Sequence, residues 1–167
     1  PRENLDALFN LVIKHVPAPS VDENAPFAML ATILDSDNFL GRILTGKVYS
    51  GKIKVNSTVK ALKLDGTKVE EGRLTKLLAF RGIERVPVEE ASAGDIIAIA
   101  GLTQATVSDT IGAQELEQPV KATPVDPPTM AITIGVNDSP LAGTEGTKVT
   151  SRMIRDRLFR EAESNVA

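Results

Sequence analysis

The sequence predicts a mainly β protein built around an antiparallel barrel, with helical segments only near the two ends. Short runs rich in Ile, Val, Leu and Thr follow one another between residues 25 and 111, which is typical of strands. Turn-forming pairs such as Asp65-Gly66 separate these runs, and no helical pattern intervenes. Many strands at short spacing without helices between them favour an antiparallel barrel or sandwich.

The N-terminal segment predicts a helix. Pro17 and Pro19 would end it, Asn4 is a candidate N-cap, and His15, the only histidine, would lie beside its last carbonyl groups. The apolar residues that recur at three- and four-residue steps are Leu5, Leu8, Phe9, Val12, Ile13 and Val16. Such a stripe needs a partner surface, so we expect it to pack on the barrel or on another molecule, or to stay partly exposed.

The barrel region contains five predicted strands. They are Phe27–Leu34, Gly41–Ser50, Thr58–Leu64, Val69–Phe80 and Asp95–Ala100. Asp65-Gly66 gives the strongest hairpin signal, because a residue pair of this type readily adopts the positive φ angles of a tight turn. The core would consist of Val, Ile, Leu and Ala, since the chain has no Trp and few other aromatic residues.

The C-terminal third predicts a linker followed by one strand, a loop and one helix. Residues 113–128 form the linker, whose prolines (Pro119, Pro124, Pro127 and Pro128) favour an extended path. A strand is expected at Met130–Val136, a Gly/Pro loop at 137–146 and a helix from about Thr147 to Ser164. One strand and one helix do not make an independent domain, so we interpret the chain as a fragment.

Gly41, Gly46 and Lys47 have the spacing of a nucleotide-binding P-loop. Val48 stands where that motif needs Ser or Thr to bind magnesium, and a strand-like alternation follows at 52–55 instead of a helix. The glycines therefore indicate bends in a barrel, and we predict that the chain binds no nucleotide.

No other catalytic or metal-binding constellation is evident. The chain has no cysteine and one histidine, which excludes Cys-based metal sites and argues against a catalytic triad. Glu70-Glu71 and Glu89-Glu90 would point to opposite faces of a strand, and Asp35 with Asp37 fits turn chemistry. We therefore expect neither a catalytic site nor a cofactor in this chain, and we disfavour a standalone enzyme.

Basic residues are concentrated in the middle of the chain. Residues 40–85 hold eleven Lys and Arg against four Asp and Glu, although the whole chain has a net charge of −3. Such a block suits a polyanion such as RNA, or else consists of solvated strand faces with acidic neighbours. From charge and location we select as RNA-contact candidates Lys52, Lys54, Arg73, Lys76 and Arg81. No 18-residue apolar run occurs, so no membrane partner is expected.

Several motifs resemble a known family. Gly41-Arg42-Ile43, Gly46-Lys47-Val48, Ser50-Gly51 and Lys54-Val55 are similar to the second, β-barrel domain of translational GTPases. The stretches at 136–143 and 149–158, Val-Asn-Asp-Ser-Pro-Leu-Ala-Gly and Val-Thr-Ser-Arg-Met-Ile-Arg-Asp-Arg-Leu, resemble the TypA/BipA branch. The resemblance implies four parts: the last helix of a preceding G domain (1–20), a translation-factor-type barrel (21–112), the linker (113–128) and the start of a ferredoxin-like third domain (129–167).

The resemblance also implies a function. A parent protein of this kind would be a cytoplasmic bacterial GTPase that uses GTP and magnesium in its G domain and acts in translation, ribosome assembly or stress response. This chain lacks a complete P-loop and the Asn-Lys-x-Asp motif that reads guanine. It would instead dock on ribosomal RNA and ribosomal proteins and contact the other domains of its parent.

Two points stay open at the level of sequence. A protein-binding barrel adaptor without a nucleic-acid role is the alternative function. Asn137, Asp138 and Ser139, with Arg152 on the following helix, form either a contact loop that faces another domain or the ribosome, or a flexible connector. The apolar stripes of the end helices further predict that the isolated chain self-associates.

Overall fold

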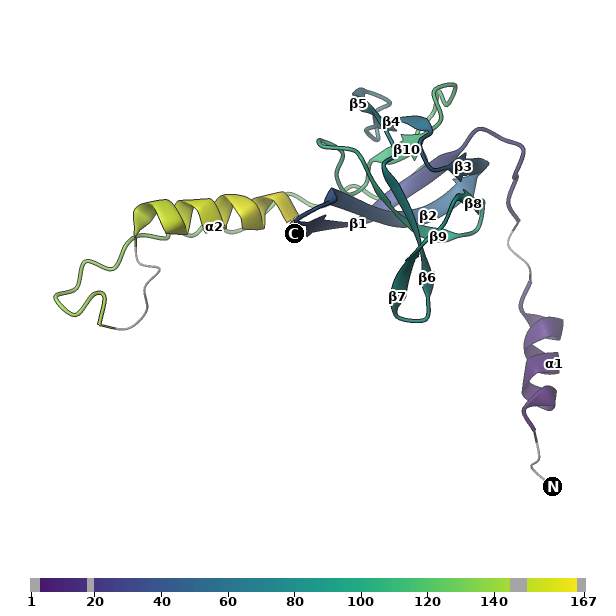
Figure 1. The fold of residues 1–167 in the computed structure, drawn as a ribbon, viewed down its shortest axis with the longest axis horizontal. Helices are drawn as coiled ribbons and strands as arrows, with labels where there is room; N and C mark the ends of the chain where they lie inside the picture. Colours follow the sequence, from purple (N-terminus) through teal and green to yellow (C-terminus); the bar gives the residue numbers. More distant parts are fainter. Residues whose placement is uncertain (1–3, 18–19, 145–149, 165–167) are drawn as a thin grey trace.

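The computed structural model describes residues 4–17, 20–144 and 150–164. It shows a curved β structure in the middle of the chain, with one helix set apart from it near the N-terminus and a second helix, near the C-terminus, that extends away from the end of the first strand (Figure 1). The helices are α1 (Asp6–His15) and α2 (Ser151–Ser164). The strands are β1 (Ala28–Asp37), β2 (Gly41–Ser50), β3 (Lys52–Lys54), β4 (Thr58–Leu62), β5 (Lys68–Arg73), β6 (Lys76–Arg81), β7 (Glu84–Pro87), β8 (Glu90–Ser92), β9 (Ile96–Ala100) and β10 (Thr110–Gly112).

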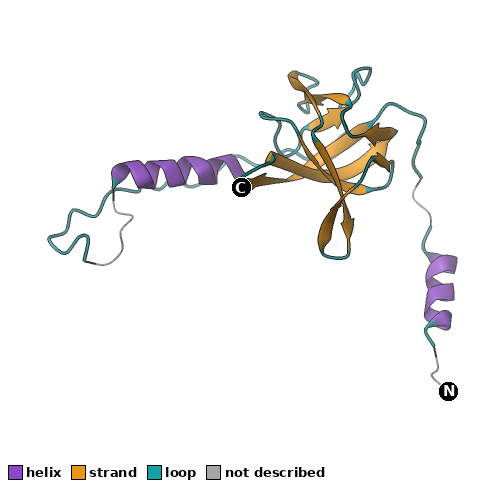
Figure 2. Cartoon of the chain, in the orientation of Figure 1, coloured by secondary structure: helices purple, strands orange, loops and turns teal. Residues whose placement is uncertain are grey.

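The strands form two sheets with antiparallel pairing. Figure 2 shows that they gather in the middle of the molecule, between the two helices. The larger sheet has eight strands in the order β5-β4-β10-β1-β2-β9-β6-β7, and the smaller one pairs β3 with β8. The β6–β7 hairpin projects from the body of the barrel (Figure 1). The predicted mainly β, antiparallel, barrel-like fold is therefore confirmed, as are helices on both sides of it.

Alternation along the strands builds two apolar clusters on opposite faces of the large sheet. The main core lies on the inner face and also receives Ile53 of β3 and Ala91 of β8, so both sheets enclose it. Its largest fully buried side chains include Met29, Leu44, Leu74, Leu77, Ile97, Ile99 and Ile111. Neighbouring positions on the same strands, Ile43, Leu78, Ala98 and Ala100, form a smaller cluster on the other face, because successive side chains point to opposite faces.

Two glycines are required where backbones approach closely. At Gly46, an added Cβ atom would lie 1.9 Å from the carbonyl oxygen of Leu30, beside an irregularity in the β1–β2 register. Gly51 has a φ angle of 72° and packs against Ala25 and Phe27, so a side chain there would be both strained and blocked. Of the two glycines that imitate a P-loop, Gly46 thus serves strand packing, while Gly41 has open space around it and a φ angle of 71° at the start of β2.

The predicted single strand Val69–Phe80 is interrupted at Leu74 and Thr75. The Leu74 N–H donates to Ser57 at 3.0 Å, and the Thr75 N–H donates to Ala100 at 2.9 Å. Before this point β5 pairs with β4, and after it β6 pairs with β9. The chain therefore turns a corner of the barrel here, with Leu74 buried inside it. Periodicity misses this corner because both halves carry strand-like residues.

The Asp65-Gly66 hairpin prediction is confirmed. Strands β4 and β5 pair across it, and Gly66 has a φ angle of 84°. The Asp65 carboxylate accepts the Thr67 N–H at 2.8 Å, and hydrogen bonds from Thr67 hold the pKa of Asp65 below its ordinary value. Local turn chemistry alone is sufficient to place this hairpin.

The flanking segments differ from expectation in three details. The N-cap residue of α1 is Leu5 and not the predicted Asn4. Asn4 precedes Leu5, and its side-chain oxygen accepts the Asp6 N–H at 3.4 Å. Helix α2 begins at Ser151; of the expected start, residues 147–149 lie outside the described residues. The strand predicted at Met130–Val136 is wrong: this segment is irregular, because no described strand lies beside it to complete a ladder.

Candidate nucleic-acid interface

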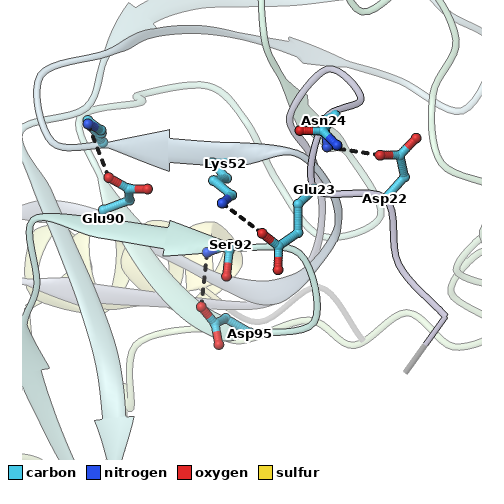
Figure 3. A network of polar contacts seen from close by, with 8 residues as sticks. Asp22, Glu23, Asn24, Lys52, Glu90, Ser92 and Asp95 are labelled. Carbon is cyan, nitrogen blue, oxygen red and sulfur yellow. Dashed lines mark hydrogen bonds and ion pairs between the residues drawn. The ribbon is translucent and has the colours of Figure 1, made fainter. Parts of the chain in front are cut away.

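Lys52 and Lys54 lie on β3, and both have acidic partners. Figure 3 shows the pair of Lys52 and Glu23. The Lys52 ammonium group is 2.7 Å from Glu23, which belongs to the segment that enters the barrel. Lys54 is 3.1 Å from Glu90, which lies directly opposite it on β8. The alternating Lys-Ile-Lys pattern therefore places Ile53 in the core and two compensated charges outside it.

The field of these carboxylates affects the titration of Lys52. The hydrogen bond to Glu23 raises the pKa of Lys52 above its ordinary value, and the charges of Glu23 and Glu90 act in the same direction. The entering segment is fixed further by the Gly51 N–H, which donates to the Asp22 carbonyl oxygen at 2.8 Å. This cluster thus joins the approach from α1 to the small sheet, and the raised pKa keeps Lys52 charged at neutral pH.

The other three candidates lie near the corner and along β6. Arg73 ends β5, and its Nε donates to the Asn56 carbonyl oxygen at 2.9 Å. Lys76 and Arg81 begin and end β6 and are exposed, and their side chains have no hydrogen bond or ion pair with any residue that the structure describes. Of the five selected cations, these two alone keep their whole hydrogen-bonding capacity for an external partner.

The rest of the basic block is distributed around the barrel. Arg85 is 3.0 Å from Asp35 and lies over the Phe80 ring, 5.7 Å from its centroid. Lys68 pairs with Glu71 at 2.5 Å, and Lys47 lies over a tyrosine ring. Acidic neighbours therefore compensate four cations of the block, Lys52, Lys54, Lys68 and Arg85.

The loop candidates lie on the surface. The Asn137 side chain accepts the Ser139 N–H at 3.0 Å, and the Ser139 carbonyl oxygen accepts the Ala142 N–H at 2.8 Å, which makes an Asx-turn followed by a tight turn. Asp138 is exposed beside them. Arg152 is exposed in the first turn of α2, and residues 145–149 between these two places lie outside the described residues.

Two of the carboxylates considered for catalysis, Glu70 and Glu71, have structural roles. Burial acts to raise the pKa of Glu70, but hydrogen bonds from the N–H groups of Thr103, Ala105 and Gln104 hold it below its ordinary value. Its neighbour Glu71 instead pairs with Lys68 and accepts from Gln114 at 2.6 Å. Glu70 therefore clamps the 103–105 loop, a role that the sequence gives no signal for.

The apparent P-loop lies in a strand and not at the start of a helix. Lys47, the lysine of the apparent P-loop, lies within the extended strand β2 and not before a helix. Among residues 4–17, 20–144 and 150–164, no group of three or more His, Cys, Asp and Glu could hold a metal ion. Neither of the two helices described is long and apolar enough to cross a membrane.

Sequence reasoning missed the acidic partners Glu23 and Glu90. Glu90 could have been found by pairing the Glu-Ala-Ser of β8 against the Lys-Ile-Lys of β3, since both runs place a small or branched apolar residue between polar ones. No sequence pattern indicates Glu23, because the segment before β1 meets Lys52 only in the folded structure. Long-range topology thus decides which lysines are compensated.

Comparisons with known proteins identify relatives of both the barrel and the whole chain. Residues 41–112 match the family described as elongation factor Tu domain 2. The "Large ribosomal subunit assembly factor BipA" of Synechocystis sp. is 44% identical over 165 residues, which are 99% of this chain and 28% of that protein. The proteins of the same name from Bacillus subtilis and Escherichia coli are each 39% identical over 99% of this chain and 27% of their own length. The chain therefore spans little more than a quarter of these relatives.

Proposed function

Since this chain belongs to the TypA/BipA family, we propose that it docks its parent protein on the ribosome and transmits movement between neighbouring domains, without catalysing a reaction itself. The similarity extends over 99% of the chain, and the relatives are named for assembly of the large ribosomal subunit. The partner we propose is accordingly the bacterial ribosome, in the cytoplasm, through ribosomal RNA and ribosomal proteins.

The parent protein that we infer is a translational GTPase. Its GTP and magnesium would be bound by a G domain, of which residues 1–20 are the last helix. Residues 21–112 would be the second domain, 113–128 the linker and 129–167 the start of a third domain. This division is supported by α1, which has no buried residue and so presents its apolar side to a further domain. The parent would act in ribosome assembly, translation or adaptation to stress.

The observation that carries RNA docking is the contrast among the five candidate cations. Lys76 and Arg81 are exposed on β6 without a partner in the described structure, whereas Lys52 and Lys54 have carboxylates within 3.1 Å. A cation that is already paired gains less from a phosphate, because it must give up an existing contact. We therefore assign the main contact with the RNA backbone to Lys76 and Arg81, a secondary one to Arg73, and the least to Lys52 and Lys54. Backbone charge and shape, and not base sequence, would guide this contact.

The contact loop is a separate part of the proposal. Asn137, Asp138 and Ser139 are held in turns that leave their surroundings open, and Arg152 lies exposed on α2. We propose that this loop faces another domain of the parent or the ribosome. Deletion of the turn residues would then weaken ribosome binding while leaving the unfolding of the barrel unchanged.

A protein-binding adaptor is the second candidate, and the hairpin tips favour it. Phe39 at the β1–β2 tip is 98% exposed, and Ile83 at the β6–β7 tip is 100% exposed. Large apolar side chains in such positions are suited to a protein partner. Docking of this kind would depend weakly on salt, in contrast to binding of RNA.

Co-sedimentation of the chain with purified bacterial ribosomes over a salt series tests the proposal. Binding at low salt that is lost at moderate salt, and that is weakened in the Lys76→Glu/Arg81→Glu variant, would support RNA docking. The Phe39→Ser/Ile83→Ser variant is the control for the adaptor. Salt-insensitive binding that only this control abolishes would replace RNA docking by the adaptor function, and absence of binding at every salt concentration would refute docking by this chain.

A further inference from the structure

A surface hollow of about 590 Å³ lies between strands β1 and β2, the turn before β10 and the chain that leaves the barrel. Four segments distant in sequence contribute to it, with Tyr49 on β2 and Lys121 on the departing chain among its lining residues. The remaining lining residues are Leu30, Ala31, Thr32, Val107, Ser108, Ala122 and Thr123. The hollow thus combines apolar walls, hydroxyl groups, an aromatic ring and a cation.

Backbone hydrogen bonds fix the walls of the hollow. The Ser108 N–H donates to the Ala31 carbonyl oxygen at 2.8 Å, which attaches the turn to β1. The Val120 N–H donates to the hydroxyl group of buried Thr110 at 2.9 Å, which holds the departing chain on the barrel just before Lys121. The hollow is therefore a feature of the folded barrel and does not need a ligand to form it.

Tyr49 is the most informative residue of the hollow. It is the only tyrosine of the chain, and it is 43% exposed although it belongs to a strand with a buried face. Lys47 lies two residues earlier on the same side of β2, and its ammonium nitrogen is 5.4 Å from the centroid of the Tyr49 ring. A partly exposed ring with a cation beside it is suited to stack on a nucleobase whose phosphate the cation attracts.

The charge of the hollow is consistent with the same ligand. Among the described residues that line it, Lys121 is charged and none is acidic, while Lys47 adjoins the ring from outside the hollow. Thr32, Ser108 and Thr123 supply hydroxyl groups that can donate to or accept from base edges and a ribose 2′-hydroxyl. Both lysines differ from the β6 cations to which we assign the main docking contact.

We propose that this hollow binds one unpaired nucleotide of an RNA, with its base stacked on Tyr49 and its phosphate between Lys47 and Lys121. The inference rests on the proposed function, because it names a second element of the RNA that the barrel contacts. A single-stranded loop or end is required, since a base within a duplex does not expose its face. Stacking is sequence-tolerant, so we expect little preference among the four bases.

The single tyrosine permits a direct test. Biosynthetic replacement by 3-fluorotyrosine gives the intact chain one ¹⁹F resonance, which reports on position 49 alone. We expect octaadenylate RNA to shift this resonance at low salt, whereas inorganic polyphosphate of equal charge leaves it in place. No shift at saturating octaadenylate, or an equal shift with polyphosphate, would overturn the assignment of a base-stacking site.

Substitutions provide the second arm of the test. In anisotropy titrations with labelled octaadenylate, Tyr49→Ser should weaken binding about 5- to 100-fold, and Tyr49→Phe should retain it because the ring is kept. Lys121→Ala should weaken binding less than Tyr49→Ser does. Unchanged affinity of Tyr49→Ser would refute the proposal. Ribosome binding without the ¹⁹F shift would refute the hollow alone, and the ¹⁹F shift without ribosome binding would refute the proposed docking alone.

Discussion

The barrel buries its large apolar side chains, whereas the two flanking helices leave several of theirs exposed to water. In the barrel, alternation of the strands puts Met29, Leu77, Ile97 and similar residues out of contact with water. In α1 the apolar stripe is as regular, yet none of its residues is buried, and Ile13 is 78% exposed. Periodicity therefore predicts the element correctly in both regions, but only the barrel contains the surfaces that its own apolar residues require.

The largest expected effect is the difference between a leucine-to-alanine substitution in the barrel and one in α1, measured as the free energy of unfolding. Leu77→Ala should lower the free energy of unfolding by about 2–5 kcal/mol, because it leaves a cavity in a core position that is 1% exposed. Leu8→Ala in α1 should change it by no more than about 0.5 kcal/mol, since Leu8 is already in water. Urea unfolding monitored by circular dichroism measures both, and equal losses would show that α1 packs on the barrel in solution.

The next effect tests whether polar clamps also belong to the barrel. Glu70→Gln should lower the free energy of unfolding by about 1–3 kcal/mol, because the neutral amide accepts more weakly from the N–H groups of the 103–105 loop. Glu89→Gln is the matched control, since Glu89 is exposed and no described residue bonds its side chain. Equal losses of unfolding free energy in the two variants would show that Glu70 does not stabilise the 103–105 loop.

The pH dependence of the unfolding free energy, compared between wild type and Glu70→Gln, tests the direction of the Glu70 contribution. Since the folded state lowers the pKa of Glu70 below its ordinary value of 4.5, the unfolded chain binds more protons in acid. The stabilisation by Glu70 is therefore complete above pH 4.5 and is lost as the pH falls through the lowered folded-state pKa. The difference in unfolding free energy between wild type and Glu70→Gln should shrink over that range, and a difference that grows in acid would contradict the sign.

A smaller effect concerns the exposed faces of the helices. Because α1 and α2 present Leu8, Phe9 and Phe159 to solvent, we expect the isolated chain to self-associate as its concentration rises. Replacing Leu8 and Phe9 with serine should return it to a monomer in light scattering. A wild-type chain that stays monomeric at all concentrations would contradict this expectation.

The smallest effect concerns the paired cations. Glu23→Gln frees Lys52 from its partner, so the melting temperature should stay almost unchanged while affinity for RNA at low salt rises. Fluorescence anisotropy with labelled octaadenylate measures the gain. A loss of affinity would mean that Glu23 positions Lys52 for RNA and does not compete with it.

The extent to which sequence predicts this molecule follows the range of the interactions. Turn chemistry at Asp65-Gly66 and alternation along Gly41–Ser50 are local, and the structure reproduces both. The corner at Leu74 and the short strand Thr110–Gly112 depend on which strand lies alongside, which no local pattern encodes. The segment Met130–Val136 shows the converse, because a strand-like pattern without a neighbouring strand forms no ladder.

The candidate interface follows the same rule. Net charge identifies residues 40–85 as basic, but it does not reveal that Glu23, Glu90, Asp35 and Glu71 lie beside four of the cations. The family resemblance, carried by short motifs, agrees with the whole-chain relatives because those motifs are specific. Sequence thus leads to the proposal of a polyanionic partner, while the three-dimensional pairing shows which of the selected cations have acidic neighbours.

The most direct test compares the salt dependence of ribosome binding between two double variants. For Lys76→Ala/Arg81→Ala, the slope of log affinity against log salt should fall by roughly 1.4–1.8, the value for two lost phosphate contacts. For Lys52→Ala/Lys54→Ala, whose side chains are already paired, it should fall by less than half of that. An equal fall in both variants, or none for the β6 pair, would contradict the claim that unpaired cations on the barrel dock this chain on RNA.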